Sequence, residues 1–156
     1  MPTPESEFLK GLPPDQTTTV LSLGSPRSLS EGTILFRLGD EADEAFLVMS
    51  GKVNLTLPMR LAGRKEEVQV EERNPGRLVG WSGLIPPHRF TLQAAASVDT
   101  ELLVLPRAAL FDLFSAQPEI GYRVFSNLAR VIGQRFQLLQ AMWIREMQRV
   151  IDIQSD

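Results

Sequence analysis

Few side chains in this sequence are of the types that carry out catalysis or hold metal ions. Cysteine is absent, which excludes thiol nucleophiles, thiolate ligands and disulfides, and a single histidine, His88, cannot build a histidine metal site. Asp40 and Asp43 form a closely spaced carboxylate pair that acid–base catalysis could use. However, the sequence contains no Ser-x-x-Lys motif, no nucleophile elbow and no glycine-rich phosphate loop that opens a helix. We therefore expect neither an enzyme nor a metal site.

Composition restricts the partners of the chain. Its 156 residues suffice for one domain with a substantial core, and no second domain fits. The formal net charge of -3 provides no basic field for phosphate backbones, so we do not expect this chain to bind DNA. We also find no secretory signal and no apolar run approaching the roughly 20 residues that a bilayer requires. We expect a cytoplasmic protein that does not enter a membrane.

The elements that must position any site are clearest in residues 31–53. Runs at 33–36 and 45–49 are rich in β-branched, aromatic and aliphatic residues, which predicts two short strands. Gly39-Asp40 and Ser50-Gly51-Lys52 are turn signals. We expect Gly51 to adopt the positive φ of a hairpin turn, because glycine reaches that conformation almost without cost.

The same stretch resembles the β-roll signature of the cyclic nucleotide-binding domain family. This family includes bacterial catabolite-activator-type transcription factors, regulatory subunits of cyclic-nucleotide-dependent kinases and gated ion channels. The resemblance implies that Asp40 and Asp43 have turn and capping roles and not acid–base roles. The residues that match the signature in register and without a gap are Gly32, Leu35, Phe36, Gly39, Asp40, Ala42, Asp43, Phe46, Val48 and Gly51.

The implied fold is mainly β with flanking helices, in one domain over residues 1–156. A double-stranded β-helix, or jelly-roll β-roll, would occupy residues 26–105, after an N-terminal helical segment at 1–25 and before C-terminal helices at 106–156. The alternation in residues 53–57 predicts a half-buried strand whose Asn54 and Thr56 face water. The residue patterns also predict strands at 27–29, 67–71, 78–80, 91–96 and 101–105, a hairpin turn at 61–64, and helices at 5–12, 14–23 and 107–115.

The resemblance also implies where a ligand would bind. In the family, a cassette between two late strands opens with Phe-Gly-Glu and closes with an arginine followed by two small residues. Helix N–H groups and the arginine bind the cyclic phosphate, and the glutamate accepts a hydrogen bond from the ribose hydroxyl. Transferred to this chain, the cassette implies a ligand pocket formed by Val79, Gly80, Trp81, Ser82, Gly83, Leu84, His88, Arg89, Phe90 and Thr91.

Two cassette positions depart from the family pattern. Trp81 stands where the family has glutamate, and an indole cannot accept the hydrogen bond of the hydroxyl. Phe90 stands where the family has arginine, and Arg89, one residue earlier, would point to the other face of a strand. We therefore expect Trp81 and Phe90 to fill the pocket with apolar mass, so that binding of cyclic AMP or cyclic GMP is weak or lost.

The alternative is a functional cyclic-mononucleotide sensor. In that case the loop Pro86-Pro87-His88 absorbs the offset of one residue, Arg89 reaches the phosphate, and Trp81 replaces ribose recognition by stacking. Within this loop we expect His88 to be an ordinary exposed residue and not a ligand contact.

The C-terminal region predicts one continuous helix from Pro118 to about Ile153, because apolar residues recur at spacings of three and four. Such a helix would be about 54 Å long, more than a compact domain requires, and its distal apolar stripe would need a partner helix. The resemblance implies a parallel two-stranded coil, hence a homodimer; the alternative is a helix that bends back on its own roll. The predicted seam consists of Leu128, Ile132, Phe136, Leu139, Trp143, Met147 and Val150.

Together these patterns favour a regulatory sensory domain that acts through ligand sensing or protein interaction and through dimerisation, with helix movement as its output. A cyclic nucleotide, cyclic AMP or cyclic GMP, is the one cofactor that the resemblance implies, and a protein partner is a further expectation. In the resembled transcription factors a DNA-binding domain follows the dimer helix. The chain could therefore also be the sensory half of a catabolite-activator-type regulator without that domain.

Overall fold

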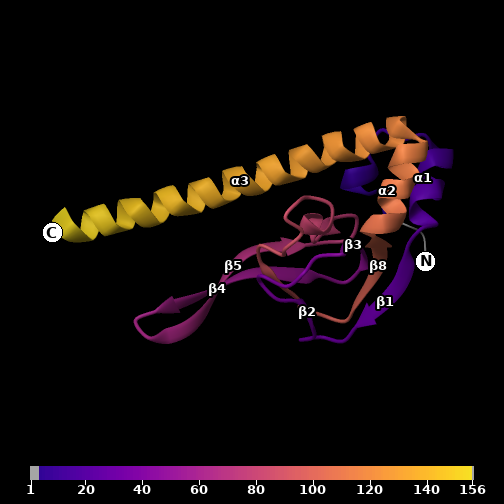
Figure 1. The fold of residues 1–156 in the computed structure, drawn as a ribbon. Helices are drawn as coiled ribbons and strands as arrows, with labels where there is room; N and C mark the ends of the chain where they lie inside the picture. The colour runs from indigo at the N-terminus through magenta and orange to yellow at the C-terminus, as the bar shows by residue number, and fades with distance from the viewer. Residues whose placement is uncertain (1–3, 156) are drawn as a thin grey trace.

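Two four-stranded antiparallel sheets form the body of the molecule (Figure 1). The computed structural model describes residues 4–155, with only the backbone of Leu61. The first sheet has the order β1 (Ser25–Leu29), β8 (Thr100–Pro106), β3 (Glu44–Ser50) and β6 (Leu78–Val79). The second has the order β2 (Ile34–Phe36), β7 (Gln93–Ala96), β4 (Val53–Leu61) and β5 (Arg64–Arg73).

Helices precede and follow the strands of this roll in the sequence. The short 3-10 helix η1 (Glu7–Leu9) and α1 (Pro14–Leu21) precede it, η2 (Trp81–Gly83) lies between β6 and β7, and α2 (Arg107–Ala116) and α3 (Pro118–Ser155) follow it. The predicted fold class, a mainly β jelly-roll with N-terminal helices and a long C-terminal helix, is therefore confirmed. None of the helices within residues 4–155 is both long and apolar enough to span a bilayer.

The turn at Gly51 differs from the prediction in one respect. Gly51 has a φ of +87°, as expected, but it does not close a hairpin between paired strands. β3 pairs with β8 and β6, whereas β4 pairs with β5 and β7 in the other sheet. Crossing between the sheets lets the apolar faces of β3 and β4 meet across the core, which a hairpin within one sheet would not allow.

The core has two layers that share β3. Phe46 and Val48 face the interior of the roll, where the two sheets meet. Ala45 and Leu47 face the other way and pack under the helices, together with residues such as Phe8 from η1. Because β3 is buried on both faces, it holds the helical layer and the roll in a fixed relation.

The expectation that Asn54 and Thr56 face water is wrong. Thr56 is only 7% exposed, and Asn54 is half-buried with its Oδ1 atom unpaired among the described residues. β4 is an interior strand, and its pairing with β5 shifts register between Leu55 and Thr56. The extra residue of this bulge, Val70, lies on β5, so β4 keeps its alternation: Val53 and Leu55 face the roll core, and Asn54 and Thr56 lie on the opposite face, where they are shielded from water.

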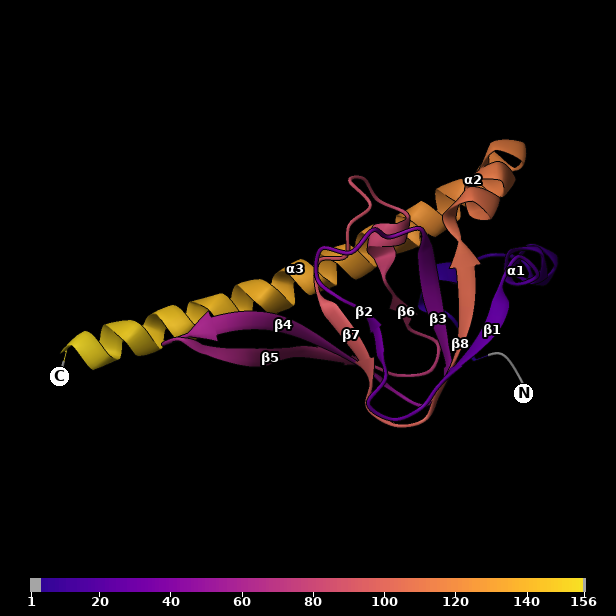
Figure 2. The same ribbon diagram turned by 60° about the horizontal axis from the view of Figure 1, so that its bottom comes forward.

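The β4–β5 hairpin extends from the roll in the same direction as α3 (Figure 2). Its tip is the predicted turn, with positive φ at Ala62 and Gly63. Pro58 lies within β4 beyond Thr56, the last residue of β4 that pairs with β7. Its missing N–H therefore interrupts no ladder on that side.

α3 is one continuous helix of 38 residues, as predicted, and it does not bend back on the roll. Its first turns are buried through Ile120, Val124, Leu128 and Val131, and the distal half leaves the body (Figure 1). The helix is thus anchored at one end only.

Replacing Gly51 by Ala should destabilise the roll more than the same change at Gly32. Both glycines have positive φ, so each alanine costs about 1–2 kcal/mol of unfolding free energy. At Gly51 a Cβ would also lie 2.5 Å from Asp99 O and 2.7 Å from Thr100 Cα, while at Gly32 nothing lies within 4 Å. Urea unfolding should show an additional loss of about 1–3 kcal/mol for Gly51→Ala. Equal losses for the two variants would contradict this packing.

Candidate functional site

The loop that joins β6 to β7 carries the residues singled out in the sequence. It begins at Gly80, whose φ of +76° lies in the left-handed region. A Cβ at Gly80 would lie 3.0 Å from Phe90 and 3.2 Å from Phe46, so glycine is needed here for space as well as for conformation. The backbone of the loop is therefore packed directly against aromatic rings.

Phe90 fills the interior of the roll. Its ring stacks on Phe36 with a centroid distance of 3.6 Å and an interplanar angle of 5°, and only 6% of the residue is exposed. The space that remains there, which we call the interior cavity, has a volume of about 10 Å³. Ligand pockets typically measure about 300–1,000 Å³, and about 10–15 Å³ holds a single water molecule.

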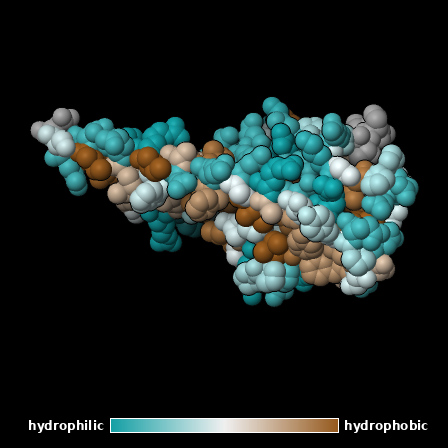
Figure 3. Space-filling view, turned by 90° about the horizontal axis from the view of Figure 1, so that it is seen from above, coloured by the Kyte–Doolittle hydropathy of each residue, from teal (hydrophilic) through white to brown (hydrophobic). Residues whose placement is uncertain are grey.

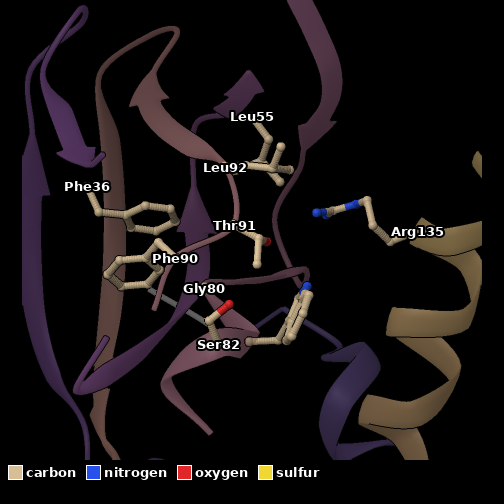
Figure 4. Close-up of a pocket in the computed structure, with 9 residues that line it drawn as sticks. Phe36, Leu55, Gly80, Ser82, Phe90, Thr91, Leu92 and Arg135 are labelled. Atoms are coloured by element: carbon tan, nitrogen blue, oxygen red, sulfur yellow. The ribbon is translucent and has the colours of Figure 1, made fainter. Parts of the chain in front are cut away.

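Five of the predicted pocket residues do meet around the interior cavity (Figure 4). Ser82 is 4% exposed, Trp81 is half-buried, and Thr91 is exposed. Val79 and Leu84 are instead buried in the roll core and in the helix-side core, respectively. The residues that line the interior cavity are Gly80, Trp81, Ser82, Phe90 and Thr91 from the prediction, and Phe36, Leu55, Leu92 and Arg135 in addition.

Arg89 lies on the surface and not in the pocket. Its side chain is 57% exposed; Nη1 donates to Gly39 O at 3.2 Å, and Nη2 lies 3.9 Å from Glu41 Oε1. Since Phe90, the next residue, faces inward, alternation along the chain turns Arg89 outward. The geometry of the loop thus offers no arginine to a ligand inside the roll.

His88 is not the ordinary exposed residue that we expected. It is half-buried, has a φ of +57°, and its Nδ1 atom lies 3.3 Å from Ser82 O, a contact in which the ring N–H donates. The left-handed backbone at this position turns the ring back toward η2. Within residues 4–155 no cluster of three or more His, Asp or Glu side chains could hold a metal ion.

Arg135 is the site residue that sequence reasoning missed. It reaches from α3 toward Thr91 and Leu92 (Figure 4), and its side chain is 7% exposed. Nε donates to Glu71 Oε2 at 2.8 Å, and Nη2 lies 2.7 Å from the same oxygen. The available signal was its spacing: Arg135 lies four residues after Val131 and four before Leu139, on the apolar face of the helix.

Arg135 belongs to a chain of charges that we call the guanidinium network, formed by Glu7, Glu71, Arg73, Arg77 and Arg135. Glu71 Oε1 accepts from Arg73 at 2.9 Å, and Glu7 accepts from Arg73 and from Arg77, each at 2.8 Å. Burial lowers the pKa of Arg73, whereas the neighbouring carboxylates of Glu7 and Glu71 oppose this shift. The network joins α3 to β5 and η1, and it holds three cations against two anions.

The residues of the predicted dimer seam differ in exposure: the first two are buried or half-buried, and the other five are exposed. Leu128 is 1% exposed within the helix-side core, and Ile132 is half-buried against it, because this part of α3 packs on its own roll. Leu128 is therefore unavailable to a partner chain, which corrects the prediction at this position. Apolar side chains gather on the projecting part of α3 (Figure 3); of the predicted seam, the exposed residues are Phe136, Leu139, Trp143, Met147 and Val150.

Comparison with known proteins identifies relatives of this chain. The family model of the cyclic nucleotide-binding domain matches residues 26–117. The cyclic AMP receptor protein of Thermus thermophilus is 31% identical over 125 residues, which cover 80% of this chain and 56% of the receptor. A Pycsar effector protein of Xanthomonas perforans is 28% identical over 137 residues, which cover 87% of this chain and 42% of the effector.

A solved structure agrees with these matches. The catabolite activator protein of Thermus thermophilus aligns with a TM-score of 0.71 at 30% identity, covering 96% of this chain and 63% of that protein. The chain thus spans less than two thirds of the length of each of these relatives.

Replacing Glu7 by Gln should test whether the guanidinium network stabilises the fold. The variant leaves the buried Arg73 short of one anion, and we expect a loss of about 3 kcal/mol of unfolding free energy in urea. The matched control is Glu146→Gln, which removes a surface pair whose side chains are more than 60% exposed and should cost less than about 1 kcal/mol. Similar losses in both variants would mean that the network contributes no more than a surface pair.

Proposed function

Because this chain belongs to the cyclic nucleotide-binding domain family, we propose that it is a regulatory sensory domain in which ordinary binding of cyclic AMP and cyclic GMP is weak or lost. The observation that carries the proposal is the stack of Phe90 on Phe36, which leaves about 10 Å³ inside the roll. A cyclic nucleotide does not fit there without displacing a buried ring.

The polar chemistry of the cassette supports the same conclusion. Trp81 replaces the acceptor for the ribose hydroxyl, and Arg89 faces water instead of the phosphate. The loss of each hydrogen-bonding partner costs about 1–3 kcal/mol, so the two losses together remove about 1.5–4 decades of affinity. The filled interior and the missing polar partners therefore both lower the affinity for cyclic nucleotides.

The output of the domain, in this proposal, is the position of α3 in a homodimer. Phe136 and Trp143 are each 64% exposed on the projecting helix, and such an apolar stripe is stabilised by pairing with a second helix. A ligand or protein partner that favours one packing of α3 against the roll would shift the population of that packing. The domain would act without catalysing a reaction, and in the cytoplasm.

The curated relatives are longer than this chain and supply the context of the proposal. In this proposal the domain passes its state to a neighbouring segment or to a partner protein through the helix that leaves the roll. This chain offers α3 for that purpose, since its distal half contacts little of the body.

We expect cyclic AMP and cyclic GMP at millimolar concentration to leave the melting temperature unchanged. A ligand at 100 times its dissociation constant would add about 2.7 kcal/mol, enough to raise the melting temperature of a domain of this size by several degrees. A saturable rise in a thermal-shift titration would support the functional-sensor alternative and refute the proposal. In that event, loss of the shift in Arg89→Ala would assign the binding to the displaced arginine.

Dimerisation is tested by one substitution on each face of α3. Trp143→Asp should make the protein monomeric in sedimentation velocity, because a charge at the seam would be buried without a partner. The control is Ala141→Asp, an exposed position two residues away and therefore on nearly the opposite side of the helix, which should leave the dimer intact. A wild-type protein that sediments as a monomer, or a Trp143→Asp variant that stays dimeric, would rule out this seam.

A further inference from the structure

The apolar side chains along α3 (Figure 3) follow a spacing that differs from that of an ordinary coiled coil. In a coiled coil of the common kind the sequence repeats every seven residues, and the spacing alternates between three and four. Here the residues of the predicted seam lie four, four, three, four, four and three residues apart, so an eleven-residue pattern occurs twice between Leu128 and Val150. The part beyond the helix-side core, which we call the eleven-residue seam, consists of Ile132, Phe136, Leu139, Trp143, Met147 and Val150.

The length of the repeat determines how two such helices wind around each other. An eleven-residue repeat corresponds to about 3.67 residues per turn, and a seven-residue repeat to about 3.5. At about 100° per residue, the positions of the eleven-residue seam fall within an arc of about 80° on α3. Two helices that keep this stripe in contact form a right-handed supercoil, whereas a seven-residue stripe gives a left-handed one.

α3 also offers a seven-residue seam, and the two seams differ beyond Trp143. The seven-residue seam contains Glu146 where the eleven-residue seam contains Met147, and it continues to Ile153. The side chain of Glu146 is 62% exposed, and Met147 is 42% exposed. The choice between the two seams therefore decides whether a carboxylate or a thioether is buried next to Trp143.

Burial of Glu146 would be costly. Its Oε2 atom lies 3.3 Å from Nη1 of Arg149 in a surface ion pair. In a two-fold dimer the seven-residue seam would bring the two copies of Glu146 together away from water, where like charges repel and each carboxylate loses its hydration. The eleven-residue seam leaves this ion pair at the surface and buries only apolar side chains.

The two flanks of the stripe differ in charge, which favours a parallel second copy of α3. From Ile132 onward the charged side chains next to the stripe lie on one flank, and the other flank is uncharged. In a parallel pair each flank meets the opposite flank of the partner, so no like charges are brought together. The charged flank includes Arg135, Glu146, Arg149 and Asp152, and the uncharged flank consists of Gly133, Gln137, Gln140, Ile144 and Ile151.

We propose that α3 pairs in parallel with α3 of a second copy of this chain through the eleven-residue seam, as a right-handed coil with Met147 inside the seam and Glu146 outside it. The proposal rests on the homodimer of the proposed function and adds which side chains meet and how the helices wind. Because Ile132 is half-buried against the helix-side core and also begins the seam, one stripe joins the packing of α3 on the roll to its packing on the second copy.

Disulfide cross-linking tests the register, because the chain has no cysteine of its own. Met147→Cys and Glu146→Cys place a thiol at neighbouring positions, only one of which lies in each seam. A disulfide requires Cα atoms about 4.4–6.8 Å apart, so under mild oxidation we expect Met147→Cys to form a covalent dimer at least about tenfold faster than Glu146→Cys. The control Ala141→Cys, on the far side of the helix, should link no faster than Glu146→Cys. Equal rates at 146 and 147, or a faster rate at 146, would overturn the eleven-residue seam.

Sedimentation of two further variants tests the same register without cysteine. Met147→Glu should raise the dissociation constant of the dimer at least about tenfold, because it buries an unpaired charge, while Glu146→Leu should leave this constant within about twofold of the wild type. Marked tightening by Glu146→Leu would support the seven-residue seam and overturn the proposal. A monomeric wild-type protein would refute the homodimer of the proposed function together with this seam, whereas a dimer linked faster at 146 would refute the seam alone.

Discussion

The stack of Phe90 on Phe36 is the contact on which the rest of the site depends. By occupying the space between the two sheets, it leaves the roll without an interior pocket and fixes the loop from Gly80 to Phe90 over the aromatic cluster. Because Phe90 points inward, Arg89 points to water. One aromatic side chain therefore removes both the volume and the cation that the family uses for a cyclic phosphate.

The second feature that determines the structure is the anchoring of α3 to the roll. Apolar residues such as Leu128 bury its first turns, and the contact of Arg135 with Glu71 ties the next turn to β5. Beyond Leu139 the helix has no comparable anchor in its own roll, and its apolar side chains face outward.

Local patterns predicted most of the fold and part of the site. The turns at Gly39 and Gly51, the strands of the roll and the continuous α3 follow from glycine placement and periodicity, which neighbouring residues determine. The errors at Gly51 and His88 come from sheet crossing and from a left-handed residue, and the error at Thr56 comes from its burial on an interior strand. All three depend on distant partners. Arg135 was missed because its partner Glu71 is 64 residues away, and no pattern in α3 alone shows that pairing.

Fluorescence of Trp81 tests the central claim, that the stack of Phe90 on Phe36 closes the interior cavity to cyclic nucleotides, because Trp81 lines that cavity. The chain has two tryptophans, so Trp143→Phe leaves Trp81 as the sole reporter. The account predicts that cyclic AMP at millimolar concentration leaves the emission of Trp81 unchanged. A saturable change in this emission on addition of cyclic AMP would contradict the account.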